Sequence, residues 1–166
     1  MVTARPMTDG SKLTSDDWVT PKWLAALLGP FDLDPCSNAR SHISAVEMCT
    51  LDGAIASESA NVFLDGLTHD WRDSSIFCNP PYGSVMPWAA KLAEHRGAWC
   101  ALLKFDPTTR WFATLMTANP IVSPFRKRIK FEGTPNMTAN FPSVLVYRAW
   151  VPSRELEQHL WIARYA

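Results

Sequence analysis

The sequence predicts a single α/β domain in which a mixed sheet lies between two layers of helices. Three observations favour this class: apolar runs of strand length, helical stretches that alternate with them, and Gly or Pro at the junctions. A chain of 166 residues, 47% of them hydrophobic, is long enough to form one domain with a buried hydrophobic core, but is short for two such domains. We therefore expect a three-layer α/β/α domain over residues 16–166, preceded by a flexible polar arm over residues 1–15.

The amino-terminal part of the domain begins with a short helix and a strand. Residues 21–28 form the predicted helix, because Thr20 stands at the cap position and Gly29-Pro30 follows the helix end. Residues 31–33 form the first strand. Residues 39–61 are rich in Ala and Ser and carry few large apolar groups, so we assign no element to them.

The rest of the chain alternates strands with helices. The expected strands cover residues 75–78, 99–103, 121–122, 127–131 and 143–150, and the expected helices cover residues 86–95 and 108–117. Trp99 to Leu103 is a continuous apolar run, as expected of a central parallel strand. Residues 127–131 and 143–150 alternate in polarity, which predicts antiparallel strands near an edge of the sheet.

Charge is balanced over the chain but divided along it. With 16 basic and 16 acidic residues, the chain lacks the net positive charge typical of a nucleic-acid binder. Residues 1–73 carry 11 acids and 5 bases, a net charge of −6, whereas residues 74–166 carry 5 acids and 11 bases, a net charge of +6. A cationic ligand at the acidic half and a polyanion at the basic half would favour this division, and chance surface patterning produces it too.

The spacing of cysteine and histidine indicates neither a metal site nor a disulfide framework. The four cysteines form no Cys-x-x-Cys pair, and the four histidines show no ligand spacing. No stretch of eighteen apolar residues occurs, and the first fifteen residues lack an apolar signal core. We therefore expect a soluble cytoplasmic protein with reduced thiols, without a metal ion and without membrane contact.

One tetrapeptide, Asn79-Pro80-Pro81-Tyr82, directly follows the apolar run at residues 76–78 and carries the most chemical information. If that run is a buried strand, the tetrapeptide lies at the carboxyl edge of the sheet, where open α/β sheets bind ligands. Two consecutive prolines fix φ and donate no N–H, so Asn79 is extended and the backbone carbonyls stay free as acceptors. The sequence therefore predicts a preformed acceptor pocket.

This pocket suits a planar amine. The Asn79 amide oxygen and the Pro80 carbonyl accept both hydrogens of the amine, and Tyr82 offers a flat surface for stacking. Drawing those hydrogens out of conjugation frees the nitrogen lone pair for attack on an electrophilic methyl group, with neither a metal nor a charged base. The alternative is an ordinary turn, because Asn-Pro and Pro-Pro are common in loops.

Three further segments accompany the tetrapeptide. They are Trp18-Val19-Thr20-Pro21, Phe31-Asp32-Leu33-Asp34-Pro35-Cys36 and, as a weaker match, Leu64-Asp65-Gly66-Leu67 followed by Trp71. Together with Asn79 to Gly83 they resemble the phage-type DNA N6-adenine methyltransferases, over about residues 16–131. The resemblance implies a methyltransferase-like (Rossmann-like) fold, S-adenosylmethionine as cofactor, and methyl transfer to the exocyclic N6 of a flipped adenine in DNA.

The resemblance implies that Trp18, Thr20 and Pro21 approach the methionine portion of the cofactor. A helix amino end accepts a carboxylate, so the roles of Thr20 as helix cap and as ligand are compatible. A purely capping threonine is the alternative. Asn79, at the end of the later strand, is expected to adjoin the same cofactor.

Two acidic loops complete the implied cofactor site. In the first, formed by Asp34 and Pro35, the Asp34 carboxylate accepts a hydrogen bond from the cofactor's ammonium; this loop lacks the glycine-rich form of dinucleotide-binding folds. Asp65 matches the residue that receives the amino group of the cofactor's adenine, and an exposed loop aspartate is the alternative. Glu47 is a weaker candidate for the ribose hydroxyls.

The substrate side depends on basic residues late in the chain. Four positive charges fall within five positions, at Arg126, Lys127, Arg128 and Lys130. The segment 128–131 resembles one seen late in the phage family, so we interpret these charges as phosphate contacts, with a solvated charged face as the alternative. Lys104 and Trp111, which follow the apolar strand at 99–103, are expected at the mouth of the pocket, and Tyr82 is expected to receive the adenine.

Other reactions and a non-enzymatic role stay open on the residues alone. Cytosine N4, an RNA adenine and a protein glutamine also present planar nitrogens, and the same fold serves in non-catalytic nucleic-acid-binding modules. Duplex DNA is the expected partner, and its adenine must then leave the stack at a cost of about a few kcal/mol. The chain has little room for a separate recognition region. We expect a monomer or homodimer. Either a partner or the second subunit assists recognition of the DNA sequence, or the recognised sequence is short and loosely specified.

Overall fold

The computed structural model describes residues 18–50, 61–132 and 138–162. The helices in these ranges are α1 (Lys22–Leu28), α2 (Val85–Glu94), α3 (Arg110–Met116) and α4 (Arg154–Glu157). The strands are β1 (Phe31–Asp34), β2 (Ala45–Cys49), β3 (Asn61–Phe63), β4 (Ile76–Cys78), β5 (Trp99–Lys104), β6 (Ile121–Pro124) and β7 (Ser143–Arg148). The part of the chain expected to be a flexible arm, residues 1–15, lies outside the described residues.

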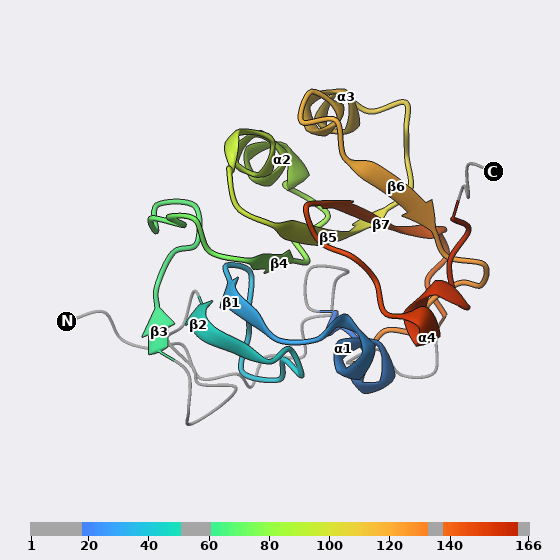
Figure 1. Ribbon diagram of the computed structural model, residues 1–166, viewed down its shortest axis with the longest axis horizontal. Helices are drawn as coiled ribbons and strands as arrows, with labels where there is room; N and C mark the ends of the chain where they lie inside the picture. Colours follow the sequence, from blue (N-terminus) through green and yellow to red (C-terminus); the bar gives the residue numbers. More distant parts are fainter. Residues whose placement is uncertain (1–17, 51–60, 133–137, 163–166) are drawn as a thin grey trace, which may run out of the picture.

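Seven strands of the described ranges form one sheet in the order β3-β2-β1-β4-β5-β7-β6. In Figure 1, α2 and α3 cover one face of this sheet, while α1 and α4 cover the other. The predicted three-layer α/β/α fold with a mixed sheet is therefore confirmed. Among the described segments, none of the helices has the length and apolarity that crossing a bilayer requires.

The direction of the strands brings several loops to one edge of the sheet. β1 to β5 pair in parallel, whereas β7 is antiparallel to both of its neighbours, β5 and β6. β1 and β4 are adjacent and pair through Leu33 and Ile76. The loops that follow β1 and β4 therefore lie at the same carboxyl edge, where open α/β sheets bind ligands.

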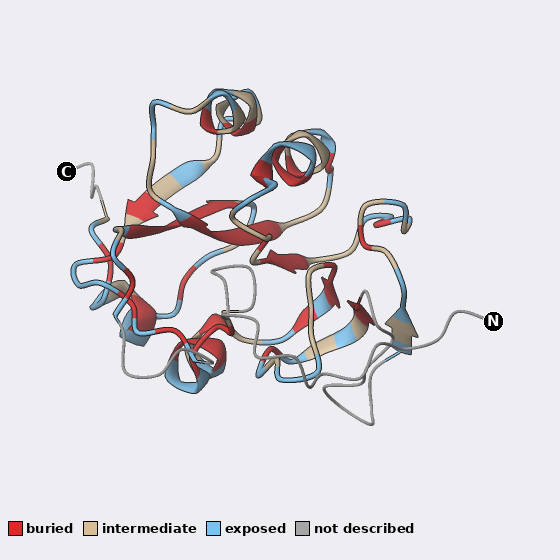
Figure 2. Cartoon of the chain, turned by 180° about the vertical axis from the view of Figure 1, so that it is seen from behind, coloured by how far each residue is buried: buried red, intermediate tan, exposed pale blue. Residues whose placement is uncertain are grey.

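Apolar residues fill the space on both sides of the sheet. The run from Trp99 to Leu103 in β5 is fully buried. Its side chains alternate between two clusters: Leu102 belongs to the cluster that includes Leu24 of α1, whereas Trp99 and Leu103 belong to the cluster that includes Leu92 of α2. Figure 2 shows β5 and β7 buried along most of their length, with exposed residues on the outer sides of the helices. This two-sided burial explains the continuous apolar run of the central strand.

Most predicted elements are confirmed, but the region at residues 39–61 was underestimated. It contains β2 and the first residue of β3, and residues 51–60 lie outside the described residues. β2 lies one strand from the edge of the sheet and exposes Val46 while half-exposing Glu47. Because its burial does not follow a clear alternation, the sequence pattern carried little strand signal.

The predicted strand at residues 127–131 is wrong. This segment contacts the chain outside the sheet: Val19 and Glu132 form an isolated antiparallel bridge, and the Ala139 N–H donates to the Ile129 carbonyl oxygen. Ile129 and Phe131 are buried while Lys130 is exposed, which produces strand-like alternation in a loop. The second segment of the pair, at 143–150, is confirmed as the antiparallel strand β7, next to the edge strand β6.

Candidate active site

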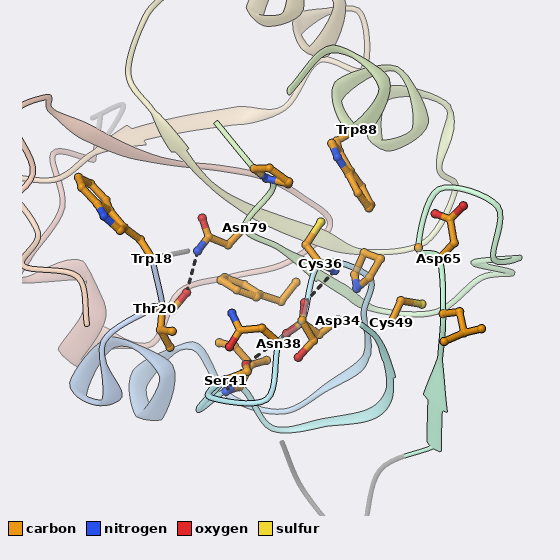
Figure 3. A pocket seen from close by; sticks show the side chains of 18 residues that line it. Trp18, Thr20, Asp34, Cys36, Asn38, Ser41, Cys49, Asp65, Asn79 and Trp88 are labelled. Carbon is orange, nitrogen blue, oxygen red and sulfur yellow. Dashed lines mark hydrogen bonds between the residues drawn. The ribbon is translucent and has the colours of Figure 1, made fainter. Parts of the chain in front are cut away.

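A cavity of about 260 Å³ opens at the carboxyl edge of the sheet. Its volume is close to the lower end of the range of about 300–1,000 Å³ for small-molecule sites. The walls include residues 18–20 before α1, residues 34–38 at the end of β1 and in the loop that follows, residues 64–66 after β3, and Asn79 and Pro81 after β4. In Figure 3, Thr20 and Asn79 lie at one end, Asp65 lies at the other, and Asp34 lies between them. The fold thus brings together residues that lie as far apart in the sequence as Trp18 and Trp88.

Asn79 lies directly after the buried strand β4 and lines the cavity. Its Nδ2 donates a hydrogen bond to Thr20 Oγ1 at 3.3 Å. Thr20 is buried at 4% exposure, so its hydroxyl is a fixed partner rather than a mobile surface group. With Nδ2 engaged, Oδ1 is the end of the Asn79 amide left to accept from a ligand. Pro81 also lines the cavity, whereas Pro80 is buried and is not part of its wall.

Thr20 does not cap α1, which corrects the sequence expectation. Pro21 occupies the cap position, and no side-chain hydrogen bond caps the helix from there. Instead the backbone N–H of Lys22 donates to Oε1 of Glu132 at 2.9 Å. The same carboxylate receives His42 Nε2 at 2.6 Å through Oε2. Because Glu132 satisfies the helix end, the Thr20 hydroxyl is available to Asn79.

Asp34 is a buried carboxyl without a cationic partner among the described residues. Burial raises its pKa to about 7, although the Cys36 N–H and the hydroxyls of Ser37 and Ser41 partly oppose this rise. The N–H of Cys36 lies 3.2 Å from Oδ1, and the Ser41 hydroxyl lies 3.4 Å from Oδ2. These few hydrogen bonds do not offset the desolvation of a charged carboxylate. The site therefore favours a ligand cation at this position.

Asp65 and Gly66 form the opposite wall of the cavity. Asp65 Oδ1 accepts the Leu67 N–H at 2.9 Å, and this hydrogen bond is the main cause of its lowered pKa. A Cβ atom at Gly66 would lie 2.0 Å from the Pro35 carbonyl oxygen, so the two loops pack backbone against backbone. Neither lysine nor arginine occurs among the described residues that line the cavity, whereas two aspartates, Asp34 and Asp65, do.

Tyr82 is beside the cavity rather than in its wall. Its ring packs edge-on against Phe141 at 5.3 Å and against Phe131 at 6.4 Å between centroids. The hydroxyl is buried, has no hydrogen-bond partner among the described residues, and has a raised pKa because of that burial. Trp18, which does line the cavity, stacks on Phe141 at 5.6 Å with an interplanar angle of 17°. These four rings form an aromatic cluster beside the cavity, and Trp18 is the member that lines it.

The predicted substrate residues separate into two groups. Lys104, at the end of β5, holds its ammonium 5.7 Å from the Phe141 centroid and so joins the aromatic rings beside the cavity. Arg126 instead donates from Nε to the Leu160 carbonyl oxygen and lies 4.7 Å from the Trp161 centroid. The other three basic residues of this segment, Lys127, Arg128 and Lys130, are exposed, and Arg128 also donates to the Ala139 carbonyl oxygen.

Glu47 is directed away from the cavity. Its carboxylate pairs with Arg72 at 2.6 Å and with His69 at 3.2 Å. Residues that the sequence did not single out occupy nearby wall positions, among them Asn38, Ser41, Cys49 and Trp88. Cys49 ends the unpredicted strand β2, and Ser41 lies seven positions beyond Asp34 in a stretch without a recognisable pattern. Neither residue carries a local signal that would have identified it.

The residues that match known proteins include the whole of this site. The family model described as DNA N-6-adenine-methyltransferase (Dam) matches residues 8–151. The chain is also similar to the DNA N-6-adenine-methyltransferase of Haemophilus phage HP1 (strain HP1c1), with 29% identity over 149 residues. That alignment covers 81% of this chain and 79% of the phage protein. The family match includes every described strand of the sheet and every cavity residue named above.

Proposed function

The chain belongs to the DNA N-6-adenine-methyltransferase family, and we propose that its cavity binds S-adenosylmethionine next to Asn79, which receives a flipped adenine. Methylation of DNA adenine is the reaction that family membership supports. The observation that carries the finer proposal is the position of Asn79: its amide lies at one end of a cavity that is lined by two aspartates, Asp34 and Asp65.

The chemistry of the cavity fits S-adenosylmethionine. Asp34 lacks a cation among the described residues, so the cofactor's ammonium would supply the missing charge and lower the pKa of that carboxyl. Asp65, at the far end, would accept from the adenine amino group. Trp18 and Phe77 contribute apolar surface to the walls. When bound, the cofactor supplies an electrophilic methyl group on its sulfonium.

Asn79 and Pro80 would hold the target amine. We propose that Asn79 Oδ1 accepts one of the amine's hydrogens while Thr20 keeps Asn79 Nδ2 occupied, and that the carbonyl oxygen of Pro80, a residue outside the cavity wall, accepts the other once the base has entered. Because Pro80 and Pro81 have no backbone N–H, neither competes for these acceptors. When both hydrogens of the amine are held by these acceptor oxygens, the nitrogen lone pair becomes available for attack on the methyl group. Positioning of the amine next to the cofactor further increases the rate of methyl transfer.

The aromatic rings beside the cavity support a place for the flipped base. Tyr82 follows Asn79 by three positions, and its edge contacts with Phe131 and Phe141 hold its ring in one orientation. We propose that the base stacks near Tyr82 and that the exposed Lys104, Arg128 and Lys130 contact phosphates of duplex DNA. Arg126 is already engaged by Leu160 and Trp161, so its phosphate contact is the weakest of these proposals. We further propose that the protein acts as a monomer or homodimer.

The test is methyl transfer from labelled S-adenosylmethionine to separate substrates: duplex DNA, the same sequence as RNA, DNA without adenine, and a glutamine-containing protein. We expect label only in adenine-containing DNA, with N6-methyladenine as the product identified by mass spectrometry. Label in N4-methylcytosine, in RNA or in protein would replace the proposed substrate. Cofactor binding by calorimetry without transfer to any substrate would indicate a non-catalytic nucleic-acid-binding module.

A further inference from the structure

Lys91 holds the turn that carries one wall of the cavity. It lies in the last turn of α2, and its Nζ donates to the carbonyl oxygens of Leu67 and His69, each at 2.6 Å. A third carbonyl oxygen, that of Gly66, lies at 3.3 Å. A lysine ammonium has three donors, and all three have acceptors within this one turn. The ammonium therefore stands at the centre of the turn.

Trp71 closes the other side of this arrangement. Its Nε1 donates to the Gly66 carbonyl oxygen at 2.8 Å, and its ring centroid lies 4.7 Å from Lys91 Nζ. Trp71 is buried at 3% exposure, so it forms a fixed wall. Partial burial lowers the pKa of Lys91, while the charge of Asp65 opposes that shift. Hydrogen bonds to carbonyl oxygens and a cation–π contact with the Trp71 ring thus replace part of the hydration of the Lys91 ammonium.

The turn that Lys91 holds, residues 65–69, also forms part of the cavity, because Asp65 and Gly66 line it. Asp65 Oδ1 accepts the Leu67 N–H, and the Asp65 carbonyl oxygen accepts the His69 N–H, each at 2.9 Å. Gly66 is pressed against Pro35, which belongs to the loop that carries Asp34. A shift of this turn would therefore move Asp65 directly and the Asp34 loop through the Gly66 contact.

We propose that Lys91 is a positioning residue that holds the Asp65–Gly66 wall in the shape that binds the cofactor. The proposal deepens the proposed function and rests on it, because it names a residue outside the cavity that sets affinity for S-adenosylmethionine. Lys91 touches neither the cavity nor Asn79 in the described structure. Its effect is therefore expected on cofactor binding and not on acceptance of the target amine.

The experiment compares Lys91→Met with wild type. Methionine keeps an unbranched apolar chain but removes all three donors. In the cofactor-free protein, we expect amide hydrogen exchange at Leu67 and His69 to accelerate by about tenfold, because a turn that loses charged hydrogen bonds opens more often. Affinity for S-adenosylmethionine, measured by calorimetry, should fall by about tenfold or more, while kcat at saturating cofactor stays within about threefold. Arg154→Met, at an exposed arginine of α4 that does not line the cavity, is the control and should change none of these quantities.

Each outcome decides the proposal. Exchange that stays at the wild-type rate, or that accelerates over the whole sheet, contradicts a local holding role. Local acceleration with unchanged cofactor affinity also overturns it. If wild type itself fails to bind S-adenosylmethionine, the proposed function fails and the link to the cofactor fails with it, while the exchange result still shows whether Lys91 holds the turn. Should Lys91→Met not fold, Lys91→Gln, which keeps two amide donors, is measured with a smaller change expected.

Discussion

Asn79 Nδ2 donates to the hydroxyl of Thr20 at 3.3 Å, a contact that joins residues 59 positions apart. It connects the segment before α1 with the loop after β4 and leaves the Asn79 amide oxygen available at the cavity. Thr20, which the family resemblance implies as a cofactor ligand, therefore also orients Asn79, the proposed acceptor of the target amine.

Removal of the Thr20 hydroxyl should slow methyl transfer. Thr20→Val keeps the branched shape and removes the acceptor for Asn79, so we expect the single-turnover rate to fall by about tenfold, the equivalent of one buried hydrogen bond. Thr20→Ser keeps the hydroxyl and should remain within about twofold of wild type. Equal rates for the two variants would show that this hydrogen bond does not position Asn79.

Cofactor affinity should depend on pH through Asp34. Its carboxyl, with a pKa of about 7, is protonated below that pH in the cofactor-free protein and ionised above it. A cationic ligand selects the ionised form, so the dissociation constant of S-adenosylmethionine should rise as pH falls below 7, by up to about tenfold per pH unit, and level off just above pH 7. Calorimetry from about pH 5.5 to about pH 7.5 measures this, because α-amino groups such as that of the cofactor lose their own proton at about pH 7.7–8.0. Asp34→Asn should bind weakly with a flat profile, and a wild-type profile equally flat would contradict the role of Asp34.

The same carboxyl should reduce stability as pH rises. Between the ordinary value of 3.8 and about 7, the folded state holds a proton that the unfolded state has lost, so the free energy of unfolding decreases with pH across this window and then levels off. Asp34→Asn removes that cost. Its midpoint of thermal unfolding at pH 8 should therefore exceed that of wild type, and a lower midpoint would count against the buried, unpaired state of Asp34.

Tyr82 offers a test of stacking that separates the ring from its hydroxyl. Tyr82→Ala should slow transfer by an amount equivalent to about 1–3 kcal/mol, because a base loses its stacking surface. Tyr82→Phe should transfer at nearly the wild-type rate, since the hydroxyl has no partner among the described residues. If the rate at saturating cofactor is unchanged in Tyr82→Ala, the base does not stack there.

Lys104 should contribute one phosphate contact. Its ammonium is exposed near Phe141 and free of ion pairs within the described ranges. Lys104→Gln should weaken binding to duplex DNA and reduce the slope of log affinity against log salt concentration by about one. Lys22→Gln on α1 serves as the control with an unchanged slope. A Lys104→Gln slope equal to that of wild type removes Lys104 from the DNA interface.

The sequence predicted the parts of this site that depend on local pattern and strand direction. Asn79 follows an apolar strand, and the carboxyl edge of such strands is where open α/β sheets bind ligands, so its position could be derived. Asp34 and Asp65 were expected in the site through the family resemblance alone. Asp34 meets Asn79 because β1 and β4 are parallel neighbours, and that pairing was not predictable from the sequence. β3, which precedes Asp65, is short and largely exposed and carries no clear strand pattern.

Contacts between distant segments could not be predicted. Glu132 replaces Thr20 at the amino end of α1 across 110 positions, and no local pattern indicates such a partner. Lys91 shows no motif, since its acceptors are backbone carbonyls, which every sequence has. The alternation at 127–131 predicted a strand because Ile129 and Phe131 are buried, although their burial comes from packing outside the sheet. Tertiary packing decided each of these cases.

The central claim is that Asn79 accepts the target amine beside a bound cofactor. The most direct measurement pairs single-turnover methyl transfer to adenine-containing duplex DNA with calorimetric binding of S-adenosylmethionine, for wild type and Asn79→Ala. We expect the variant to bind the cofactor with nearly wild-type affinity and to transfer no detectable methyl group. Continued transfer at a rate near that of wild type would contradict the claim.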